Sequence, residues 1–215
     1  MDIKGAIFDI DGTITDSLWV WDGVPEKFLK KHGKAPDTNM SELNKLNTAQ
    51  IGEYFKEHYF QDSKMTPEDI VFRFGLMGFR DYAFHVGLVP GARELLKQLH
   101  QEGVKMAILT ANDVRLVKAA LRHNRVYRYF DLILEGSDPA NAKDDPKAFE
   151  NACRALGTPK EQTVVFEDSV YAIQNAKAAG FRVIGMDNGR DADRDRIADL
   201  ADAYVKDYRD ILDQL

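Results

Sequence analysis

The sequence predicts an α/β fold, namely a doubly wound and mostly parallel β-sheet with an α-helical block inserted after the first strand. A short apolar run at residues 5–8 indicates a buried first strand. Residues 16–89 then carry helical patterns without strand-like runs. From residue 104 onward, apolar runs alternate with helical segments, which is typical of strand–helix–strand units with right-handed crossovers.

Length and composition favour a globular protein without nucleic-acid or membrane partners. The 215 residues suffice for one domain with an insertion, and 44% of them are hydrophobic and 30% charged. A net charge of −6 without a basic cluster disfavours nucleic-acid binding. No apolar run approaches membrane-spanning length, and the first strand follows Met1 without room for a signal peptide, so we expect a cytoplasmic protein. We expect it to be a monomer or a weak homodimer. The single cysteine, Cys153, is expected to be a buried thiol.

Two carboxylates follow the first strand at a spacing that points them in the same direction. Asp9 and Asp11 are two residues apart, and Gly12 allows the backbone to turn after them. Carboxylates held this close repel each other unless a cation lies between them or one keeps its proton. The pair therefore indicates a metal site or a nucleophile beside an acid, although Asp-Gly is also common in hairpin turns.

The helical block is expected to be a small bundle that covers the site as a cap. Pro67 after Thr66 is typical of a helix start with Thr66 as its cap. Aromatic residues are dense in this block, and most should form its core. We therefore expect a core domain of residues 1–15 and 90–215 and a cap domain of residues 16–89. The expected cap helices are 24–32, 41–46, 48–59 and 67–84.

Pro90-Gly91 marks the return of the chain to the sheet. Polar residues follow almost every strand expected beyond it, and the carboxyl ends of parallel strands share one edge, so these residues should converge on Asp9 and Asp11. That convergence favours an active site over a turn. The expected strands are 104–109, 131–134, 163–166, 181–186 and 203–205. The expected helices are 92–101, 114–124, 146–156, 170–179 and 208–212.

Five segments of the chain carry a family resemblance. They are Phe8-Asp9-Ile10-Asp11-Gly12-Thr13-Ile14, Pro90-Gly91-Ala92-Arg93-Glu94-Leu95-Leu96, Ile108-Leu109-Thr110-Ala111-Asn112, Lys143 with Pro146 and Phe149, and Phe166-Glu167-Asp168-Ser169. In this order they resemble the haloacid dehalogenase-like superfamily, in its phosphatase and β-phosphoglucomutase branch with a helical cap. The resemblance implies a Rossmann-like core and a phosphatase that acts on a small phosphorylated metabolite.

The same resemblance implies a role for each motif residue. Asp9 would be the nucleophile that forms an aspartyl-phosphate, and Asp11 would act first as general acid and then as general base. Mg²⁺ held by Asp9, Asp168 and the backbone carbonyl of Asp11 would offset the repulsion between carboxylate and phosphate. Glu167 would either bind this metal directly or hold the residues that bind it, and we favour the second interpretation.

The remaining motif residues would hold the phosphoryl group. Thr110 and the backbone amides of Ala111 and Asn112 would bind its oxygens, while Lys143 would neutralise charge on Asp9 and the phosphate. Taken singly, Thr110 could be an ordinary strand-end residue and Lys143 an exposed loop charge. Lys147 falls inside the following helix, where a solvated position is expected.

Other activities are weighed against simple hydrolysis. True dehalogenases of this family lack the second aspartate, so Asp11 favours phosphoryl chemistry. A β-phosphoglucomutase-like phosphotransferase needs cations for a second phosphate, and the expected cap loop offers only Lys45, while Asp113, which follows Asn112, fits a helix cap. A non-catalytic phospho-acceptor of the receiver type would lack the inserted block and would not need Asp11.

Residues of the cap should set the substrate. The candidates are Trp19, Trp21 and Asn47, with Leu46 and Thr48 beside them, although core packing is the expected role of at least one tryptophan. A sugar phosphate or phosphoglycolate is the expected class of substrate.

Overall fold

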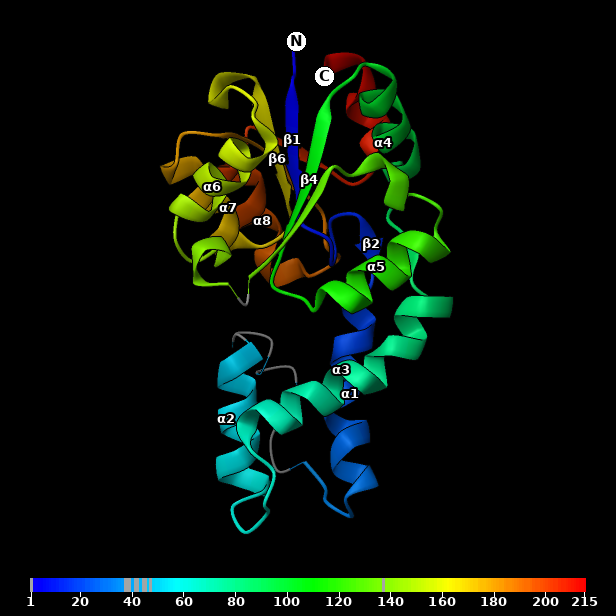
Figure 1. Ribbon diagram of the computed structural model, residues 1–215, viewed down its shortest axis with the longest axis vertical. Coiled ribbons are helices and arrows are strands. Elements are labelled where there is room, and N and C mark those ends of the chain that lie inside the picture. The colour runs from blue at the N-terminus through cyan, green and yellow to red at the C-terminus, as the bar shows by residue number, and fades with distance from the viewer. Residues whose placement is uncertain (1, 37–39, 41–42, 44–45, 47, 137) are drawn as a thin grey trace.

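The computed structural model describes residues 2–36, 40, 43, 46, 48–136 and 138–215. A β-sheet flanked by helices forms one end of the molecule, and the helices α1 (Leu18–Lys31), α2 (Thr48–Tyr59) and α3 (Pro67–Phe84) form the other (Figure 1). Both chain termini lie at the end of the sheet that is remote from α2. Within the described parts of the chain, no helix combines the length and apolarity that crossing a bilayer requires.

The sheet has six parallel strands in the order β5-β4-β1-β6-β7-β8. The first strand lies in the middle, where Gly5 is in register with Lys105 on one side and Thr163 on the other. All four residues of β1 are buried, as expected for a parallel strand covered on both faces. The predicted α/β fold is confirmed. The strands are β1 (Gly5–Phe8), β4 (Lys105–Thr110), β5 (Leu132–Glu135), β6 (Thr163–Glu167), β7 (Arg182–Met186) and β8 (Ala203–Val205).

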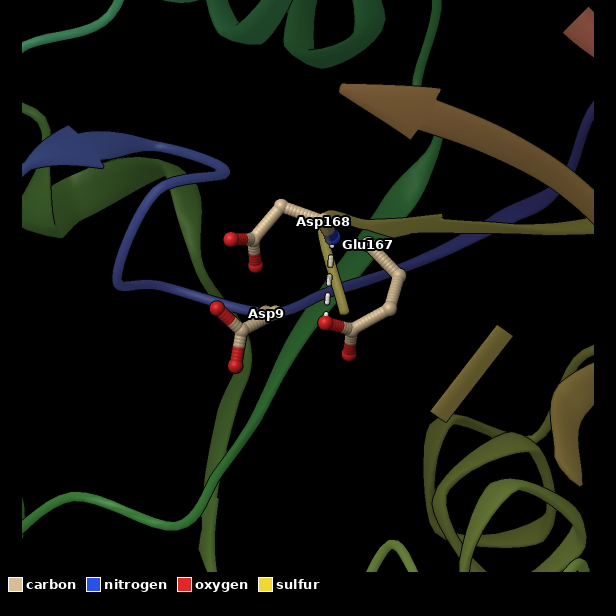
Figure 2. A group of neighbouring side chains, drawn as sticks. All are labelled: Asp9, Glu167 and Asp168. Carbon is tan, nitrogen blue, oxygen red and sulfur yellow. Dashed lines mark hydrogen bonds between the residues drawn. The ribbon is translucent and has the colours of Figure 1, made fainter. Parts of the chain in front are cut away.

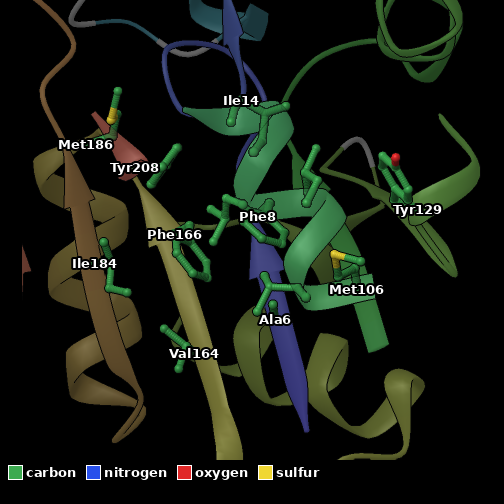
Figure 3. Packing of buried hydrophobic residues seen from close by; sticks show 14 of the residues in the cluster. Ala6, Phe8, Ile14, Met106, Tyr129, Val164, Phe166, Ile184, Met186 and Tyr208 are labelled. Atoms are coloured by element: carbon green, nitrogen blue, oxygen red, sulfur yellow. The ribbon is translucent and has the colours of Figure 1, made fainter. Parts of the chain in front are cut away.

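Helices cover both faces of this sheet. One face packs against α4, α5 and the C-terminal 3₁₀ segment, with Phe8 stacked on Phe166 at 4.4 Å between ring centroids (Figure 3). The other face packs against α6, α7 and α8, and Cys153 is buried there as expected. The helices are α4 (Ala92–Gln101), α5 (Val114–His123), α6 (Lys147–Leu156), α7 (Val170–Ala178) and α8 (Asp191–Leu200). The 3₁₀ segments are η2 (Tyr127–Tyr129), η3 (Pro139–Asn141), η4 (Lys160–Gln162) and η5 (Tyr208–Gln214).

Two helices of this layer differ from the sequence expectation. The helix α8 was not predicted, because charged residues dominate it and Ile197 is its one fully buried apolar side chain among the described residues. The closing helix predicted at 208–212 is present as η5, a longer segment of 3₁₀ type. Tyr208 and Ile211, three residues apart, are its buried side chains, which suits a helix of three residues per turn.

The helical end of the molecule is held by aromatic packing. The ring of Phe74 lies edge to face with the rings of Phe28 and Phe55. Its centroid is 5.0 Å from the centroid of each. Thr66 caps α3 in a capping box with Asp69, as the sequence predicted for Thr66. The same apolar cluster also contains Leu116 and Ala120 of α5, so it reaches into the sheet layer. The helices are α1 (Leu18–Lys31), α2 (Thr48–Tyr59) and α3 (Pro67–Phe84).

The first of these helices is longer than expected. The prediction began it at residue 24, one position before Pro25, a residue that is favoured in the first turn of a helix. In the structure α1 begins at Leu18 and includes Pro25, while Val20, Val24 and Phe28 form one buried stripe along it. Packing of that stripe outweighs the hydrogen bond that proline removes. The helix predicted at 41–46 falls largely outside the described residues.

The chain passes between the two ends of the molecule along a short antiparallel ribbon. Its strands are β2 (Thr15–Asp16) and β3 (Gly87–Leu88), which were not predicted because two residues show no periodicity. The two connections to the helical end thus lie side by side.

Candidate active site

The site lies at the carboxyl edge of the three central strands. Asp9 follows β1, and its backbone N–H donates to Phe166 O at 2.9 Å, which continues the pairing with β6. Thr110 ends β4 and Glu167 ends β6, the two neighbours of β1 in the sheet. Since parallel strands place their carboxyl ends together, residues more than a hundred positions apart meet here.

Three buried carboxylates surround a common space in this site. One carboxylate oxygen each from Asp9, Glu167 and Asp168 lies within 4.8 Å of the others. Figure 2 shows the three side chains turned toward one another, with the Asp168 N–H donating to Glu167. Within the described part of the chain, the ammonium bonded to this group is that of Lys143, 2.5 Å from Asp9 Oδ1 and 2.8 Å from Glu167 Oε2. When all three carboxylates are ionised, this ammonium compensates one of their negative charges and leaves two.

Burial and the neighbouring charges shift the pKa values of the groups in this site. Burial raises the pKa of Asp9 well above its ordinary range, and the neighbouring carboxylates add to this, while Lys143 opposes it. Burial, followed by the charge of Glu167, raises the pKa of Asp168 to about 7. Burial alone would lower the pKa of Lys143, but the attraction of Asp9 and Glu167 outweighs it and raises that pKa well above its usual value. A cation among these oxygens would relieve the same repulsion.

Neighbouring groups hold Asp168 in place. Its Oδ1 accepts a hydrogen bond from Thr13 Oγ1 at 3.2 Å, and its Oδ2 accepts one from Asn188 Nδ2 at 3.3 Å. Gly12 has a positive φ of 88°, and a Cβ there would lie 2.4 Å from Asp168 Oδ2. Glycine is therefore required both for the turn and for the approach of Asp168. Asn188 was not predicted as a site residue. The signal that could have found it is its place beside Asp187, the polar residue that directly follows β7.

Glu167 is bonded through both carboxylate oxygens. Its Oε1 accepts from the backbone amides of Asp168 and Ser169 at 3.1 Å each and from Ser169 Oγ at 2.9 Å. Its Oε2 accepts from Lys143. Glu167 thus fixes the turn after β6 and the position of Lys143, while its carboxylate remains within reach of an ion shared with Asp9 and Asp168.

Asp11 lies apart from the three-carboxylate group and is held by other partners. Its Oδ1 accepts hydrogen bonds from the hydroxyl of Tyr82 and from Ser17 Oγ, the latter at 2.5 Å. Its Oδ2 accepts from Asn112 Nδ2 at 2.8 Å. Tyr82 belongs to α3 and is fully buried, and burial together with the charge of Asp11 raises the pKa of its phenol well above the usual range. Neither Ser17 nor Tyr82 was predicted as a site residue. Tyr82 was assigned to the core of the helical block together with its other aromatic residues, and Ser17 was given no role.

The loop after β4 forms a third side of the site. Thr110 is buried, and its Oγ1 accepts a hydrogen bond from Asn112 N at 3.0 Å, so the hydroxyl retains its own proton to donate. Ala111 lies exposed between them. Asp113 Oδ1 accepts from Arg115 N at 2.8 Å, which confirms its prediction as the cap of α5.

The residues proposed for the cap have a mixed outcome. Trp19 is 43% exposed, and its indole N–H donates to the backbone carbonyl of Asp16. Among the described residues, its side chain makes no hydrogen bond to the carboxylates of the site. Trp21 instead donates to Tyr82 and thereby reaches the site. Asn47 and Lys45 lie outside the described residues. Lys143 is 6% exposed, which excludes the alternative of a loop charge in solvent, and Lys147 is exposed as expected.

Comparison with known proteins agrees with this geometry. The chain is similar to validoxylamine A 7′-phosphate phosphatase of Streptomyces hygroscopicus, with 26% identity over 97% of this chain and 95% of that protein. It is also similar to phosphoglycolate phosphatase of Pseudomonas fluorescens, with 25% identity over 96% and 78% of the two chains. Its fold matches CbbY of Rhodobacter sphaeroides in complex with phosphate, with a TM-score of 0.83, 23% identity and coverage of 97% and 96%.

A family match extends over most of the chain. The sequence model described as haloacid dehalogenase-like hydrolase matches residues 6–186, from the first strand through β7. This range contains all the strand ends that bring Asp9, Thr110 and Asp168 together. The chain is therefore a member of the haloacid dehalogenase-like hydrolase family.

Proposed function

We propose that this enzyme is a Mg²⁺-dependent phosphatase that hydrolyses a small phosphate monoester through an aspartyl-phosphate on Asp9. The observation that carries the proposal is the position of Asp9, which is buried beside Lys143 and shares a common space with Glu167 and Asp168. Its relatives include phosphatases named for validoxylamine A 7′-phosphate and for phosphoglycolate, both of which are small phosphate esters.

The donor set of the site suits a small divalent cation. Carboxylate oxygens are the ligands that Mg²⁺ prefers, and the group offers three carboxylates against the one ammonium of Lys143. We assign Asp9, Asp168 and the backbone carbonyl of Asp11 as its protein ligands, with Glu167 supporting them. When bound, Mg²⁺ supplies positive charge against the phosphoryl oxygens and orients them.

The residues of the chain then divide the reaction into two steps. An oxygen of Asp9 forms a bond to phosphorus while the bond to the ester oxygen breaks, and Asp11 gives a proton to the departing alkoxide. Asp11 next takes a proton from water, whose oxygen attacks the aspartyl-phosphate, and this releases inorganic phosphate and the Asp9 carboxylate. Thr110 Oγ1 and the amide of Ala111 donate to the phosphoryl oxygens, and Lys143 balances the charge of Asp9. The backbone amide of Asn112, which we had expected to join them, donates to Thr110 Oγ1 instead.

The helical end of the molecule is proposed as the cap that encloses a small ester. We retain residues 16–89 as the cap and residues 1–15 and 90–215 as the core. The paired crossings at β2 and β3 support this division, because both connections meet at one ribbon. Residues of the cap would exclude bulk water from the aspartyl-phosphate and select the substrate.

A panel of phosphate esters tests the proposal directly. Purified protein is given p-nitrophenyl phosphate, phosphoglycolate, glycerol phosphate and sugar phosphates with Mg²⁺ or with EDTA, and phosphate release is followed. Steady release that requires the metal and is lost in Asp9→Asn supports the proposal, and acid-stable labelling of Asp9 in a quenched reaction identifies the intermediate. Release that survives Asp9→Asn rejects the nucleophile.

Two further outcomes would replace hydrolysis by another activity. Isomerisation of glucose 1-phosphate in the presence of a trace of its bisphosphate, without phosphate release, would indicate a mutase. Uptake of one phosphoryl group per chain without turnover would indicate a phospho-acceptor. A mutase would need a cation after Asn112 to bind a second phosphate. Arg115, the nearest described cation in sequence after Asn112, is already paired with Asp113, which disfavours the mutase.

A further inference from the structure

A hydrogen-bonded series of side chains runs from α1 through α3 to Asp11. Trp21 Nε1 lies 2.8 Å from the hydroxyl oxygen of Tyr82, and that hydroxyl contacts Asp11 Oδ1. Asn112 Nδ2 also lies 2.9 Å from the same hydroxyl oxygen. Trp21 and Tyr82 belong to α1 and α3, which α2 and its loops separate in sequence. These two segments of the helical end thus meet at one carboxylate of the sheet edge.

The direction of each hydrogen bond in this series is fixed by chemistry. The indole N–H of Trp21 can only donate. The amide of Asn112 is oriented by its Oδ1, which accepts from Asp113 N at 2.8 Å, so its Nδ2 group faces Tyr82 and Asp11 as a donor. The Tyr82 oxygen accepts both bonds, and its own proton is therefore directed to Asp11 Oδ1.

The two oxygens of Asp11 consequently have different environments. Oδ1 accepts from two hydroxyl groups, those of Tyr82 and Ser17. Oδ2 accepts from the single amide of Asn112, which belongs to the loop that carries Thr110. Two hydroxyl donors therefore fix Oδ1, whereas Oδ2 accepts a single hydrogen bond and keeps lone-pair capacity for a further partner.

We propose that Tyr82 is a positioning residue for Asp11, which holds Oδ1 so that Oδ2 exchanges protons with the ester oxygen and with water. Trp21 holds the tyrosine hydroxyl in turn. The inference rests on the proposed phosphatase function and adds two residues of the helical end to its machinery. Ser17, at the start of α1, donates a hydrogen bond to the same Asp11 Oδ1.

The packing of α3 explains how Tyr82 reaches a residue of the sheet edge. Tyr82 is fully buried, and its ring centroid lies 5.8 Å from that of Trp21. One turn earlier on α3, a Cβ at Gly78 would lie 3.6 Å from Trp21 and 3.9 Å from Leu116 of α5. The close approach of α3 to both helices brings Tyr82 beside Asn112, which lies just before α5.

The test compares esters that differ in their need for a proton. An alkyl ester such as glycerol phosphate releases an alkoxide that must be protonated, whereas p-nitrophenyl phosphate releases a stabilised phenolate. The first turnover of each ester is measured with Mg²⁺ in wild type, Tyr82→Phe and Trp21→Phe. We expect Tyr82→Phe to slow the alkyl ester about 10- to 100-fold and the nitrophenyl ester less than about 3-fold, with a smaller change of the same kind in Trp21→Phe.

A double variant separates positioning from a purely structural role. If Tyr82 acts through Asp11, adding Tyr82→Phe to Asp11→Asn slows the alkyl ester no further. Tyr129→Phe is the control for hydroxyl removal, because Tyr129 is a buried tyrosine of the sheet layer whose hydroxyl is bonded to Arg128. It should change neither ester.

The outcomes distinguish this inference from the proposed function. Equal losses for both esters, no loss in Tyr82→Phe, or a further loss in the double variant would overturn the positioning role while leaving the phosphatase intact. Failure of wild type to release phosphate, or activity independent of Asp9, would reject the function itself. If Tyr82→Phe does not fold, the selectivity of Trp21→Phe decides, and its absence overturns the inference.

Discussion

The ammonium group of Lys143 lies 2.5 Å from Asp9 Oδ1, although 134 positions separate the two residues in the sequence. Both side chains are buried, and Asn175 Nδ2 donates to the backbone carbonyl of Lys143 at 2.9 Å, which fixes the loop before α6. This contact opposes the effect of burial on Asp9 and helps to keep a nucleophilic carboxylate ionised. It is also a buried ion pair, and removal of one partner should therefore affect both stability and activity.

Lys143→Met is expected to lower the free energy of unfolding by about 3–5 kcal/mol in EDTA, since it leaves buried carboxylates without their cation. Mg²⁺ should recover part of this loss, because it replaces positive charge among the same oxygens. Thermal or denaturant unfolding with and without Mg²⁺ measures both effects. Lys147→Met is the control, because Lys147 is exposed and its loss should change stability by less than about 0.5 kcal/mol. Equal stability of the two variants would contradict the prediction.

Asp9→Asn should reduce kcat by a factor of about 10⁴ or more, because an amide cannot form the aspartyl-phosphate. The fold should be retained, since the variant removes one of the repelling carboxylates. The rate is measured with p-nitrophenyl phosphate and Mg²⁺. Asp113→Asn provides the matched control, as asparagine caps a helix as well as aspartate and Asp113 serves as the cap of α5. A comparable loss in both variants would show that the assay reports folding rather than chemistry.

Gly12→Ala should lose activity by a mechanism that Gly33→Ala does not share. Both glycines have positive φ values, 88° and 68°, so each substitution should cost about 1–2 kcal/mol in backbone strain. Only the Cβ at Gly12 would meet Asp168, at 2.4 Å, whereas nothing lies within 4 Å of a Cβ at Gly33. We expect the Mg²⁺ concentration for half-maximal activity to rise at least about 10-fold in Gly12→Ala. An unchanged metal requirement would show that Asp168 tolerates displacement.

Stability without metal should fall as the pH rises toward 7. The pKa of Asp168 is raised from 3.8 to about 7 in the folded protein, and that of Asp9 is raised as well. Between these values the folded state holds a proton that the unfolded chain has lost, so the stabilisation is complete below about pH 4 and disappears as the pH passes 7.

Mg²⁺ should oppose this pH dependence, because it binds the ionised carboxylates and releases the proton. The difference between unfolding free energies in Mg²⁺ and in EDTA should therefore grow up to about pH 7 and then level off. Unfolding curves at a series of pH values measure it. Asp168→Asn should flatten the dependence, and a difference that stays constant with pH would contradict the assignment of these carboxylates to the metal.

Much of the fold and part of the site could be predicted from local sequence patterns. Apolar runs that end in polar residues marked the strands, and the order of strands and helices predicted a parallel sheet whose edge gathers Asp9, Thr110, Lys143 and Asp168. The helices α2, α3 and α4 were predicted with the bounds that the structure shows. The helix α8 was missed, because a helix that buries little apolar surface has no strong periodicity.

The partners of Asp11 depend on contacts that no local pattern encodes. Tyr82 lies among many aromatic residues of a helical block, and its hydroxyl reaches Asp11 only because α3 packs closely against α1 and α5. Likewise, Lys143 could equally be a solvated loop residue until the sheet places it beside Asp9. Local sequence patterns were enough to show which residue types stand at each strand end, since hydrophobic periodicity is a property of neighbours along the chain. Only tertiary packing decided which of them share hydrogen bonds and charge, because those energies depend on distances between segments far apart in sequence.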